Sequence, residues 1–381
     1  MSGNIITKIL ICKCCVMDTT DPNIIFDHNG VCNHCNNFQN NIIPFLKNKN
    51  RENKLAKEIE YIKKKNSKKE FDCLIGLSGG VDSSYLLHLA VKKFNLRPLV
   101  FHVDAGWNSS IAVSNIEKMI DKLNLTLQTN VVYWPEMRDL QLSFFKAQVP
   151  HLDTPQDHAF FASTYNYAVK YKINNILNGG NFSSEGVREP LDWHYHASDL
   201  YHLKDIHSKH GEILLKKFPL CGIFKYKIYY RYFKNIKVFQ PLNYINYNKK
   251  DAINSLKDEY DWEEYSHKHY ESRFTKFYEG YWLLKKFGFD KRKAHYSSLI
   301  LSKQMTRDEA LKKLNDDPID NNDVKKELQY VANKLNINES ELEAFFNGNN
   351  KSFRNYKSHF KIINFFTKIL KILGIEKRVI Q

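Results

Sequence analysis

Short apolar runs alternate with stretches of helical periodicity through the middle of the chain. Apolar runs bounded by turn residues are typical of buried strands, and they occur at residues 73–77, 99–103, 129–133 and 175–178. Helical patterns follow the first three runs, at residues 85–93, 111–123 and 154–168. Strands and helices that alternate in this way predict an α/β fold with a doubly wound parallel sheet.

Helical patterns dominate both flanks of this region. Residues 47–69 are charged and carry apolar side chains at helical spacing, which predicts a linking helix. From about Tyr247 the pattern is helical and rich in aromatic residues, which at this spacing more often form core than a ligand site. The predicted segments are an N-terminal region 1–46, the linking helix 47–69, a sheet domain 70–246, a helical substrate region 247–320 and a helical basic tail 321–381.

The first predicted strand ends in a loop suited to phosphate. It reads Ser78-Gly79-Gly80-Val81-Asp82-Ser83-Ser84 and leads directly into a helical pattern. Glycines let backbone N–H groups approach an anion, and the dipole of the following helix favours negative charge there. The loop lacks the Gly-Lys-Ser/Thr ending of a Walker A loop. A plain strand-to-helix turn is the alternative, and the agreement between the loop and its flanking elements argues against it.

Two other predicted strand ends carry candidate ligand-binding residues. Asp104 follows the second strand, and Gly179-Gly180-Asn181 follows the fourth. Ligands of open parallel sheets bind at the carboxyl ends of strands, so one pocket built from three strand ends is the simplest interpretation. In the alternative, Asp104 caps a helix and the glycine turn is an ordinary loop. Glu185 and Arg188, just beyond that turn, are weaker candidates.

The N-terminal region contains two Cys-x-x-Cys pairs. Cys12 and Cys15 form the first pair, and Cys32 and Cys35 form the second after 16 intervening residues. Two such pairs at this spacing are typical of a zinc ribbon, in which four thiolates close a tetrahedral structural site. Residues 1–46 are therefore predicted to form a zinc ribbon, with an iron–sulfur site as the alternative. Cys14 is expected to be a bystander.

The net charge and the cysteines indicate possible partners and a cellular compartment, but they do not identify a function. The formal net charge is +15, which suits nucleic acid, an anionic membrane or anionic small molecules. Residues 351–381 carry eight Lys/Arg and one Glu, and their basic amphipathic pattern could dock on the protein itself, on a partner or peripherally on a membrane. Clustered cysteines and the lack of a spanning segment or signal peptide predict a cytoplasmic protein.

Several motifs together resemble a known family. The loop at residues 78–84 resembles the PP-loop, the Ser-Gly-Gly-x-Asp-Ser signature of ATP pyrophosphatases. The whole set resembles the N-acetyl sugar amidotransferase family of bacterial surface-polysaccharide and nonulosonic-acid biosynthesis, over roughly residues 10–315. The other matching segments are residues 12–22, 30–35, 154–158, 179–181, 269–275, 287–295 and 304–307. Lys303 departs from the pattern, because a glycine is expected before Gln304.

The resemblance implies a PP-loop fold of the HUP type and an AMP-forming reaction. ATP with Mg²⁺ adenylates the amide oxygen of an N-acetyl group on a sugar, expected to be nucleotide-linked, and releases pyrophosphate. Ammonia then displaces AMP, and the acetamido group becomes an acetamidino group. The loop 78–84, Asp104 and residues 179–181 would bind ATP, with Asp82 organising the loop or a metal ion.

Two groups of residues are candidates for the acceptor side of this reaction. Gln156, Asp157 and His158, at the start of a predicted helix, could orient the acetamido group or accept a proton, or they could only cap the helix. Thr154 is the expected N-cap of that helix. The expected donors for a sugar diphosphate or carboxylate are Arg273, Lys291, Arg292, His295 and Arg307, for which a solvated charged surface is the alternative. Glu185 is a further candidate for substrate binding.

The resemblance also implies partners. No cysteine nucleophile of glutaminase type is found with suitable neighbours, so ammonia is expected from a separate glutaminase subunit, through a cyclase-like channelling protein. A tRNA-thiolating or tRNA-modifying enzyme is the competing interpretation of a PP-loop, a zinc ribbon and basic charge. Only Cys73 and Cys221 lie outside the ribbon, whereas thiolation often needs a redox pair near the loop, so nucleic acid is not the expected partner. A non-enzymatic nucleotide-binding regulator is the third reading.

Overall fold

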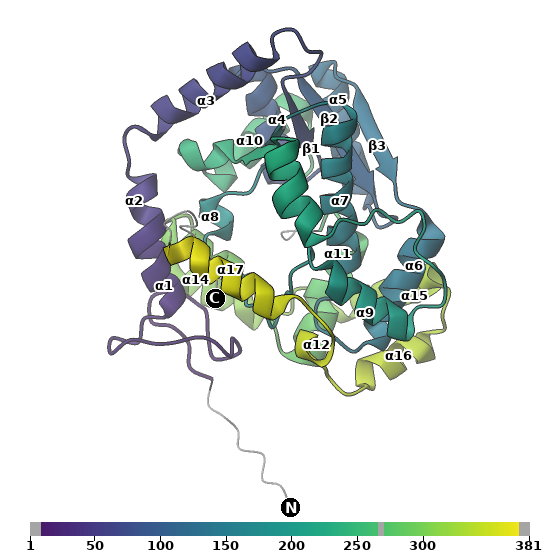
Figure 1. The fold of residues 1–381 in the computed structure, drawn as a ribbon. Coiled ribbons are helices and arrows are strands. Elements are labelled where there is room, and N and C mark those ends of the chain that lie inside the picture. Colours follow the sequence, from purple (N-terminus) through teal and green to yellow (C-terminus); the bar gives the residue numbers. More distant parts are fainter. Residues whose placement is uncertain (1–8, 266–269, 373–381) are drawn as a thin grey trace, which may run out of the picture.

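The computed structural model describes residues 9–265 and 270–372, and a parallel sheet lies at its centre (Figure 1). Five strands lie in the order β3-β2-β1-β4-β5, and every neighbouring pair is parallel. The strands are β1 Cys73–Gly76, β2 Pro98–Asp104, β3 Leu127–Val131, β4 Asn175–Leu177 and β5 Lys237–Phe239. The chain moves outward from β1 to β3 and then returns to β4, so the topological switch point lies between β1 and β4.

Alternate side chains of the central strand pack into different halves of the core. Cys73 and Ile75 of β1 lie in one apolar cluster and Leu74 lies in the other, as the two-residue period of a strand requires. The cluster around Cys73 includes residues of α3, α4, α5 and α10, whereas that around Leu74 includes residues of α6, α7, α9 and α11. Helices therefore cover both faces, and the predicted doubly wound α/β class is confirmed.

The helices of the described residues fall into three groups along the chain. Those of the N-terminal region are α1 Asn33–Asn37, η1 Phe38–Ile42, α2 Ile43–Leu46 and α3 Arg51–Asn66. Those interleaved with the strands are α4 Val81–His88, η2 Leu89–Lys93, α5 Ser110–Leu123, α6 Trp134–Lys146, α7 Thr154–Lys170, α8 Phe182–Glu185, α9 Leu200–His210 and η3 Lys225–Phe233.

The third group follows the last strand and forms the helical C-terminal region. Its members are η4 Pro241–Tyr244, α10 Lys249–Tyr260, α11 Arg273–Phe277, η5 Tyr278–Trp282, α12 Leu283–Phe287, α13 Arg292–Leu301, α14 Arg307–Asn315, α15 Asn321–Leu335, α16 Glu339–Asn347, η6 Phe353–Asn355 and α17 Phe360–Ile372. Helix α17 crosses the front of the molecule in Figure 1. No helix in the described part of the chain has the length and apolar character needed to span a membrane.

Three local predictions differ from the structure. The third strand begins two residues earlier than predicted, and β5 was not predicted, because this three-residue strand is largely exposed and has no apolar run. The N-cap of α7 is Asp153 rather than Thr154, and no side chain caps that helix. The predicted tail helix from Phe353 is divided into η6 and α17, and its expected continuation to Ile375 extends beyond the described residues.

The conformation of Gly79 predicts a difference between two neighbouring glycines. Gly79 has φ +84°, and a Cβ there would lie 2.7 Å from the carbonyl oxygen of Ala112, whereas a Cβ at Gly76 would meet nothing within 4 Å. Gly79→Ala should therefore lower the free energy of unfolding by at least about 1–2 kcal/mol. Gly76→Ala is the matched control and should leave it nearly unchanged, as measured by chemical denaturation. Equal stabilities would contradict this account of the loop.

Candidate functional site

The loop between β1 and α4 has the geometry of an anion cradle. Gly80 is the N-cap of α4, so the first N–H groups of the helix point toward the loop. The Ser78 and Ser83 hydroxyls lie 3.1 Å apart, and the Gly80 N–H donates to Ser78 Oγ at 3.3 Å. Ser78 is exposed. The loop therefore presents hydroxyls and helix-terminal amides together at the carboxyl end of the central strand.

Residues from the C-terminal region hold this loop from outside. The Trp262 indole N–H and the Tyr265 hydroxyl both donate to the carbonyl oxygen of Gly79, each at 3.2 Å. The carboxylate of Glu271 occupies the space beside Gly80, where an added Cβ would stand 1.7 Å from its Oε1. The aromatic run that includes Trp262 was predicted to form core, and no role was predicted for Glu271. The contacts of these residues with the loop were therefore not predicted from the sequence.

Asp82 joins the loop to the end of β4. Its Oδ1 accepts a hydrogen bond from Asn181 Nδ2 at 3.1 Å and another, shorter one from the Tyr247 hydroxyl. Burial and the neighbouring Asp82 raise the pKa of Tyr247 well above its ordinary value, so the phenol stays a donor. Gly179 lies against the backbone of Asp82, where a Cβ would come within 2.8 Å. The structure thus brings together two of the three predicted strand ends.

The remaining strand-end residues have local roles. Asp104 Oδ1 accepts the N–H of Gly106 at 2.7 Å and so closes the turn after β2. Asp104 does not cap a helix, because the N-cap of the following helix α5 is Ser109. The Gly180 N–H donates to Asn178 Oδ1 at 2.7 Å, and the Asn181 side chain caps α8 through the Ser184 N–H.

A cavity of about 1220 Å³ lies beside the loop, at the carboxyl ends of β4 and β5. Its walls come from α1, α2, α7, α8 and α13 and from the segment after α8. The predicted site residues that line it are Asn181, Glu185, Lys291, Arg292 and His295, together with the weaker candidate Arg188. Because Asn181 also donates a hydrogen bond to Asp82, the cavity adjoins the anion cradle. Its volume lies above the usual range of small-molecule sites and suits a ligand larger than one sugar.

Charged side chains cluster at the inner wall of the cavity. Lys291 Nζ lies 2.6 Å from Glu279 Oε1 and 3.0 Å from Glu189 Oε2. Burial acts against the charge on Lys291, yet these two carboxylates raise its pKa well above the ordinary value. Asp157 is not one of the residues that line the cavity, but its Oδ2 lies 3.5 Å from Nε2 of His194, which does line it.

The same surroundings change the pKa values of the acids. Burial, together with Glu189 and Glu279, raises the pKa of Asp157 to about 7, against the attraction of Lys291. Burial and the nearby Asp157 and Glu279 raise the pKa of Asp153 well above its ordinary value. One lysine thus faces four carboxyl groups, and the pKa values of two of these, Asp153 and Asp157, are raised.

Two histidines of the cavity wall were not predicted as site residues. His194 Nδ1 and His196 Nε2 are buried atoms without a hydrogen-bond partner among the described residues. Burial and Lys291 lower the pKa of His194 to about 4, and burial lowers that of His196, so both rings are neutral at pH 7. Unsatisfied buried polar atoms that face a cavity are candidate ligand contacts. The available sequence signal was the run Trp193-His194-Tyr195-His196 beyond the glycine turn.

Two predicted acceptor-side residues are placed elsewhere. His158 is buried, with Nδ1 2.6 Å from the carbonyl oxygen of Ala197 and Nε2 accepting the Cys221 N–H at 3.1 Å, so its ring connects two loops. Gln156 is bonded to Thr275 and Ser272 at the start of α11, at 3.2 Å each. Neither side chain lines the cavity.

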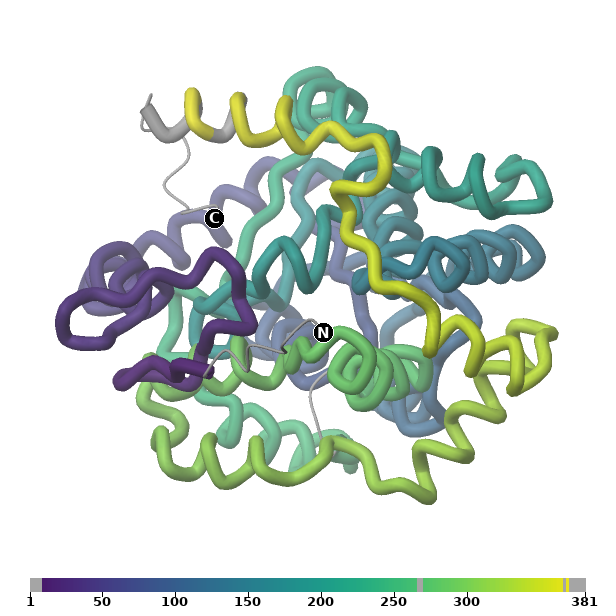
Figure 2. Tube along the Cα trace, turned by 90° about the horizontal axis from the view of Figure 1, so that it is seen from below, coloured from purple at the N-terminus to yellow at the C-terminus, as the bar shows by residue number. Residues whose placement is uncertain are grey.

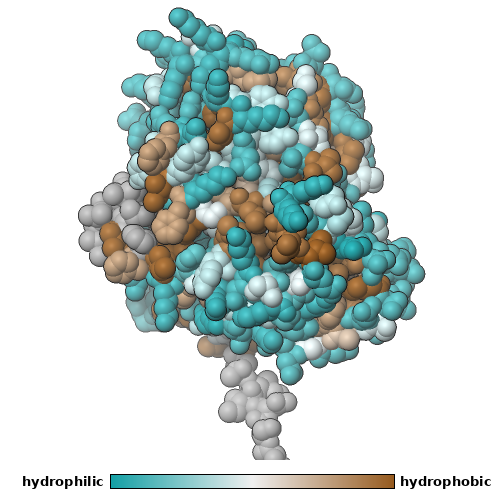
Figure 3. All heavy atoms as spheres, turned by 45° about the vertical axis from the view of Figure 1, so that its right-hand side comes forward, coloured by the Kyte–Doolittle hydropathy of each residue, from teal (hydrophilic) through white to brown (hydrophobic). Residues whose placement is uncertain are grey.

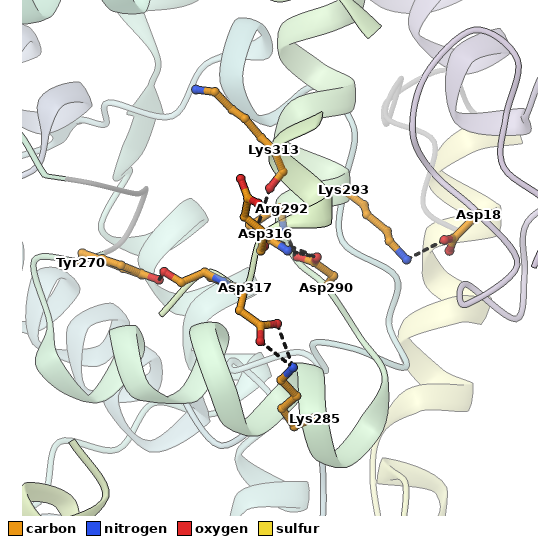
Figure 4. Close-up of polar contacts among 10 residues, drawn as sticks. Asp18, Tyr270, Lys285, Asp290, Arg292, Lys293, Lys313, Asp316 and Asp317 are labelled. Carbon is orange, nitrogen blue, oxygen red and sulfur yellow. Dashed lines mark hydrogen bonds and ion pairs between the residues drawn. The ribbon is translucent and has the colours of Figure 1, made fainter. Parts of the chain in front are cut away.

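The three predicted arginines pair with the scaffold. Arg273 stacks over Tyr330 at 3.5 Å and pairs with Glu327 at 3.0 Å. Figure 4 shows Arg292 directed at Asp290 and at the turn after α14. The guanidinium of Arg307 donates to the carbonyl oxygens of Cys12 and Cys15, at 2.9 and 3.0 Å for the shortest contacts. The guanidinium of Arg307 therefore binds the turn that carries Cys12 and Cys15 rather than a ligand.

Four cysteines form a cluster suited to a metal ion. The ligand atoms of Cys12, Cys15, Cys32 and Cys35 all lie within 4.8 Å of one another, and all four residues are buried. Sγ separations of 3.6–3.8 Å recur around the cluster, close to the roughly 3.8 Å edge of a tetrahedron with metal–sulfur bonds of about 2.3 Å. Gly30, with φ +77°, closes the turn before the second pair.

Two separate parts of the chain match known protein families. Residues 271–370 match the family described as LPS biosynthesis protein WbpG-like, C-terminal domain. Residues 72–147 match the phosphoadenosine phosphosulfate reductase domain. No curated protein sequence matches the chain.

Two solved structures are also similar. The NH3-dependent NAD synthetase from Campylobacter jejuni is 16% identical, with a TM-score of 0.28, over 54% of this chain and 84% of that one. The NMN synthetase from Francisella tularensis is 17% identical, with a TM-score of 0.28, over 60% and 92%. The chain is therefore similar to the phosphoadenosine phosphosulfate reductase domain around the loop at residues 78–84, and to the C-terminal domain of WbpG-like LPS biosynthesis proteins in its helical C-terminal region.

Proposed function

We propose that this protein is an AMP-forming amidotransferase that converts the N-acetyl group of a sugar into an acetamidino group. The observation that carries the proposal is the hydrogen bond that Asn181 donates to Asp82, which places a cavity beside the loop at residues 78–84. A PP-loop enzyme needs this proximity, because the activated oxygen must reach the α-phosphate of ATP. The WbpG-like domain match supports a role in surface-polysaccharide synthesis.

ATP and Mg²⁺ are assigned to the cradle. When bound there, ATP supplies the adenylyl group that turns an amide oxygen into a leaving group, and Mg²⁺ neutralises charge developing on pyrophosphate. The amides at the start of α4 and the Ser78 and Ser83 hydroxyls stabilise phosphate oxygens. Asp82, held by Asn181 and Tyr247, fixes the first turn of α4 relative to the cavity.

The acceptor sugar is assigned to the cavity. His194 and His196 offer unsatisfied ring nitrogens that can bond sugar hydroxyls or the acetamido group. Lys291 lies at the inner wall with its two carboxylates, and Glu185 and His295 line the same space. Asp157, in contact with His194, is the proposed proton acceptor when ammonia attacks, because its pKa of about 7 lets it exchange a proton near neutrality. The sugar's carrier is proposed to be a nucleotide.

The metal of the cysteine cluster is proposed to be Zn²⁺ in a structural role. Four buried thiolates leave no open position for a substrate, and backbone N–H groups already bond the sulfurs, as from Cys32 to Cys12 Sγ at 3.2 Å.

A separate glutaminase subunit with a cyclase-like channelling protein is the proposed ammonia source. Apart from the four cluster cysteines and Cys14, the described cysteines are Cys73 and Cys221, and both are buried. Burial raises the pKa values of both thiols, so neither is suited to nucleophilic attack.

An AMP-release assay tests the function. With ammonia, ATP and Mg²⁺, a nucleotide-linked diacetamido sugar should stimulate AMP release, and mass spectrometry should show one oxygen of the sugar replaced by NH. Asp82→Asn should lower kcat/KM by about 100-fold or more, because the loop loses the negative charge that orders it. Asp121→Asn, on the exposed side of α5, is the control. Salt-sensitive tRNA binding without sugar-dependent AMP release would favour the tRNA-modifying alternative.

The raised pKa of Asp157 predicts a pH-dependent contribution to stability. The folded pKa is about 7 and the ordinary value is 3.8, so between these values the folded protein binds more protons than the unfolded chain. The contribution of Asp157 to the free energy of unfolding therefore decreases as the pH rises from about 4 to about 7. Asp157→Asn should flatten this slope in urea unfolding, and Asp121→Asn should not. A slope identical in the wild type and Asp157→Asn would contradict the shift.

The cysteine cluster predicts that two cysteines of the N-terminal region, Cys32 and Cys14, behave differently. Cys32→Ser should abolish binding of one zinc ion per chain and lower the melting temperature by several degrees, because the site then has only three thiolates. Cys14→Ser should keep both, since Cys14 lies outside the cluster. Elemental analysis and thermal unfolding measure the two outcomes. Retention of zinc by Cys32→Ser would rule out the assigned ligand set.

A further inference from the structure

The segment η3 packs on the protein with one side and exposes large apolar side chains on the other. Its inner side packs on α7, where Tyr230 stacks on Tyr165 and Tyr226 contacts Phe161. On the outer side, Phe224, Tyr232 and Phe233 are 67%, 71% and 77% exposed. Large apolar side chains this exposed, on one stretch of chain, mark an interaction surface rather than ordinary surface composition. On the face seen in Figure 3, apolar side chains lie among hydrophilic ones across the middle of the molecule.

The charge of the same stretch has one sign. Residues 213–250 contain nine Lys/Arg and no Asp or Glu. Those on or beside η3 are Lys225, Lys227, Arg231, Lys234 and Lys237. Within the part of the chain that the structure describes, these cations contact tyrosine rings, as Lys227 does at Tyr226, and none is paired with a carboxylate. The positive charge is therefore uncompensated at this surface.

A second basic amphipathic element lies on the same side. Figures 1 and 2 both place α17 and η3 on the same side of the molecule, η3 being the teal-green helical segment in front of the sheet in Figure 1. Ile362 of α17 is 47% exposed, and Lys361 and Lys368 are exposed as well. We name η3, its flanking residues Phe224 and Lys234–Lys237, and α17 the aromatic–basic face.

We propose that the aromatic–basic face docks the protein on an anionic lipid bilayer. Tyrosine and phenylalanine favour the interfacial zone of a membrane, and lysine and arginine beside them reach the headgroups. Each such cation contributes about 1 kcal/mol of attraction near an anionic surface. A second copy of the chain is a poor occupant, because a two-fold contact would bring two uncompensated positive surfaces together. RNA suits the charge but not the exposed Phe233 and Ile362, which are placed to enter an apolar medium.

Docking through this face would hold the cavity close to the bilayer. Tyr226 of η3 lines the cavity, as do Phe161 of α7 and Val238 beyond η3. The element that meets the membrane is therefore also part of the cavity wall. The inference itself does not depend on the reaction proposed above, since it concerns surface chemistry only.

Vesicle co-sedimentation of the full chain tests the proposal. Vesicles of equal parts phosphatidylglycerol and phosphatidylcholine should bind the wild type about tenfold or more tightly than pure phosphatidylcholine, and high salt should weaken the binding. Phe224→Ser/Phe233→Ser should lower binding to the anionic vesicles about tenfold. Lys227→Glu/Arg231→Glu should lower it at least as much, because it reverses two charges of the face.

Matched control variants distinguish binding through this face from nonspecific adsorption to the vesicles. Ile25→Ser/Val131→Ser removes apolar groups that are 69% and 70% exposed elsewhere, and Lys64→Glu/Lys65→Glu makes the same charge change on α3. Both should bind anionic vesicles like the wild type. Unchanged binding by the two face variants overturns the proposal. So does binding of single-stranded RNA without binding of vesicles, or a shift from dimer to monomer as the sole effect of the face variants.

Discussion

Gly179 lies so close to the first turn of α4 that a Cβ there would come within 2.8 Å of the Asp82 backbone. This contact joins the end of β4 to the helix that begins at the loop of residues 78–84. Asn181, two residues later, then reaches Asp82 with its side chain and also caps α8. The position of α8, and with it one wall of the cavity, is thus fixed relative to the loop by one glycine and one amide. Any larger residue at 179 would separate the two halves of the site.

The sheet and the loop were predictable because their signals are local. A buried strand needs a run of apolar residues, and a helix N-terminus needs a turn that supplies free amides, so both are visible in the order of residues. The edge strand β5 was not predictable, because it is three residues long and mostly exposed. The cysteine cluster was also visible, since two tight turns with fixed spacing are enough to define four ligands.

The assignment of charged residues was less predictable for a physical reason. An arginine has five donors, and the sequence does not show whether they meet a ligand or main-chain carbonyls. Arg307 meets the carbonyls of Cys12 and Cys15, nearly 300 positions earlier in the chain. At Lys303, by contrast, the residue expected from the sequence pattern does have a visible structural reason. The φ of Lys303 is +63°, which lies in the region that favours glycine. The glycine expected there from the family resemblance therefore reflects backbone conformation, and the departure is tolerated at a cost in strain rather than by a different fold.

The surroundings of Lys291, beside the cavity, have an unbalanced charge. Asp153, Asp157, Glu189 and Glu279 surround Lys291, and one cation cannot fully stabilise four carboxylates that are partly or wholly removed from water. The raised pKa values of Asp153 and Asp157 reflect this imbalance. On the proposed reaction, a neutral acetamido group becomes a cationic amidinium in the adjoining cavity. That positive charge would lower the pKa values of the nearby carboxyl groups, and their ionised forms would stabilise the developing cation, so the same surroundings would favour the product-forming step.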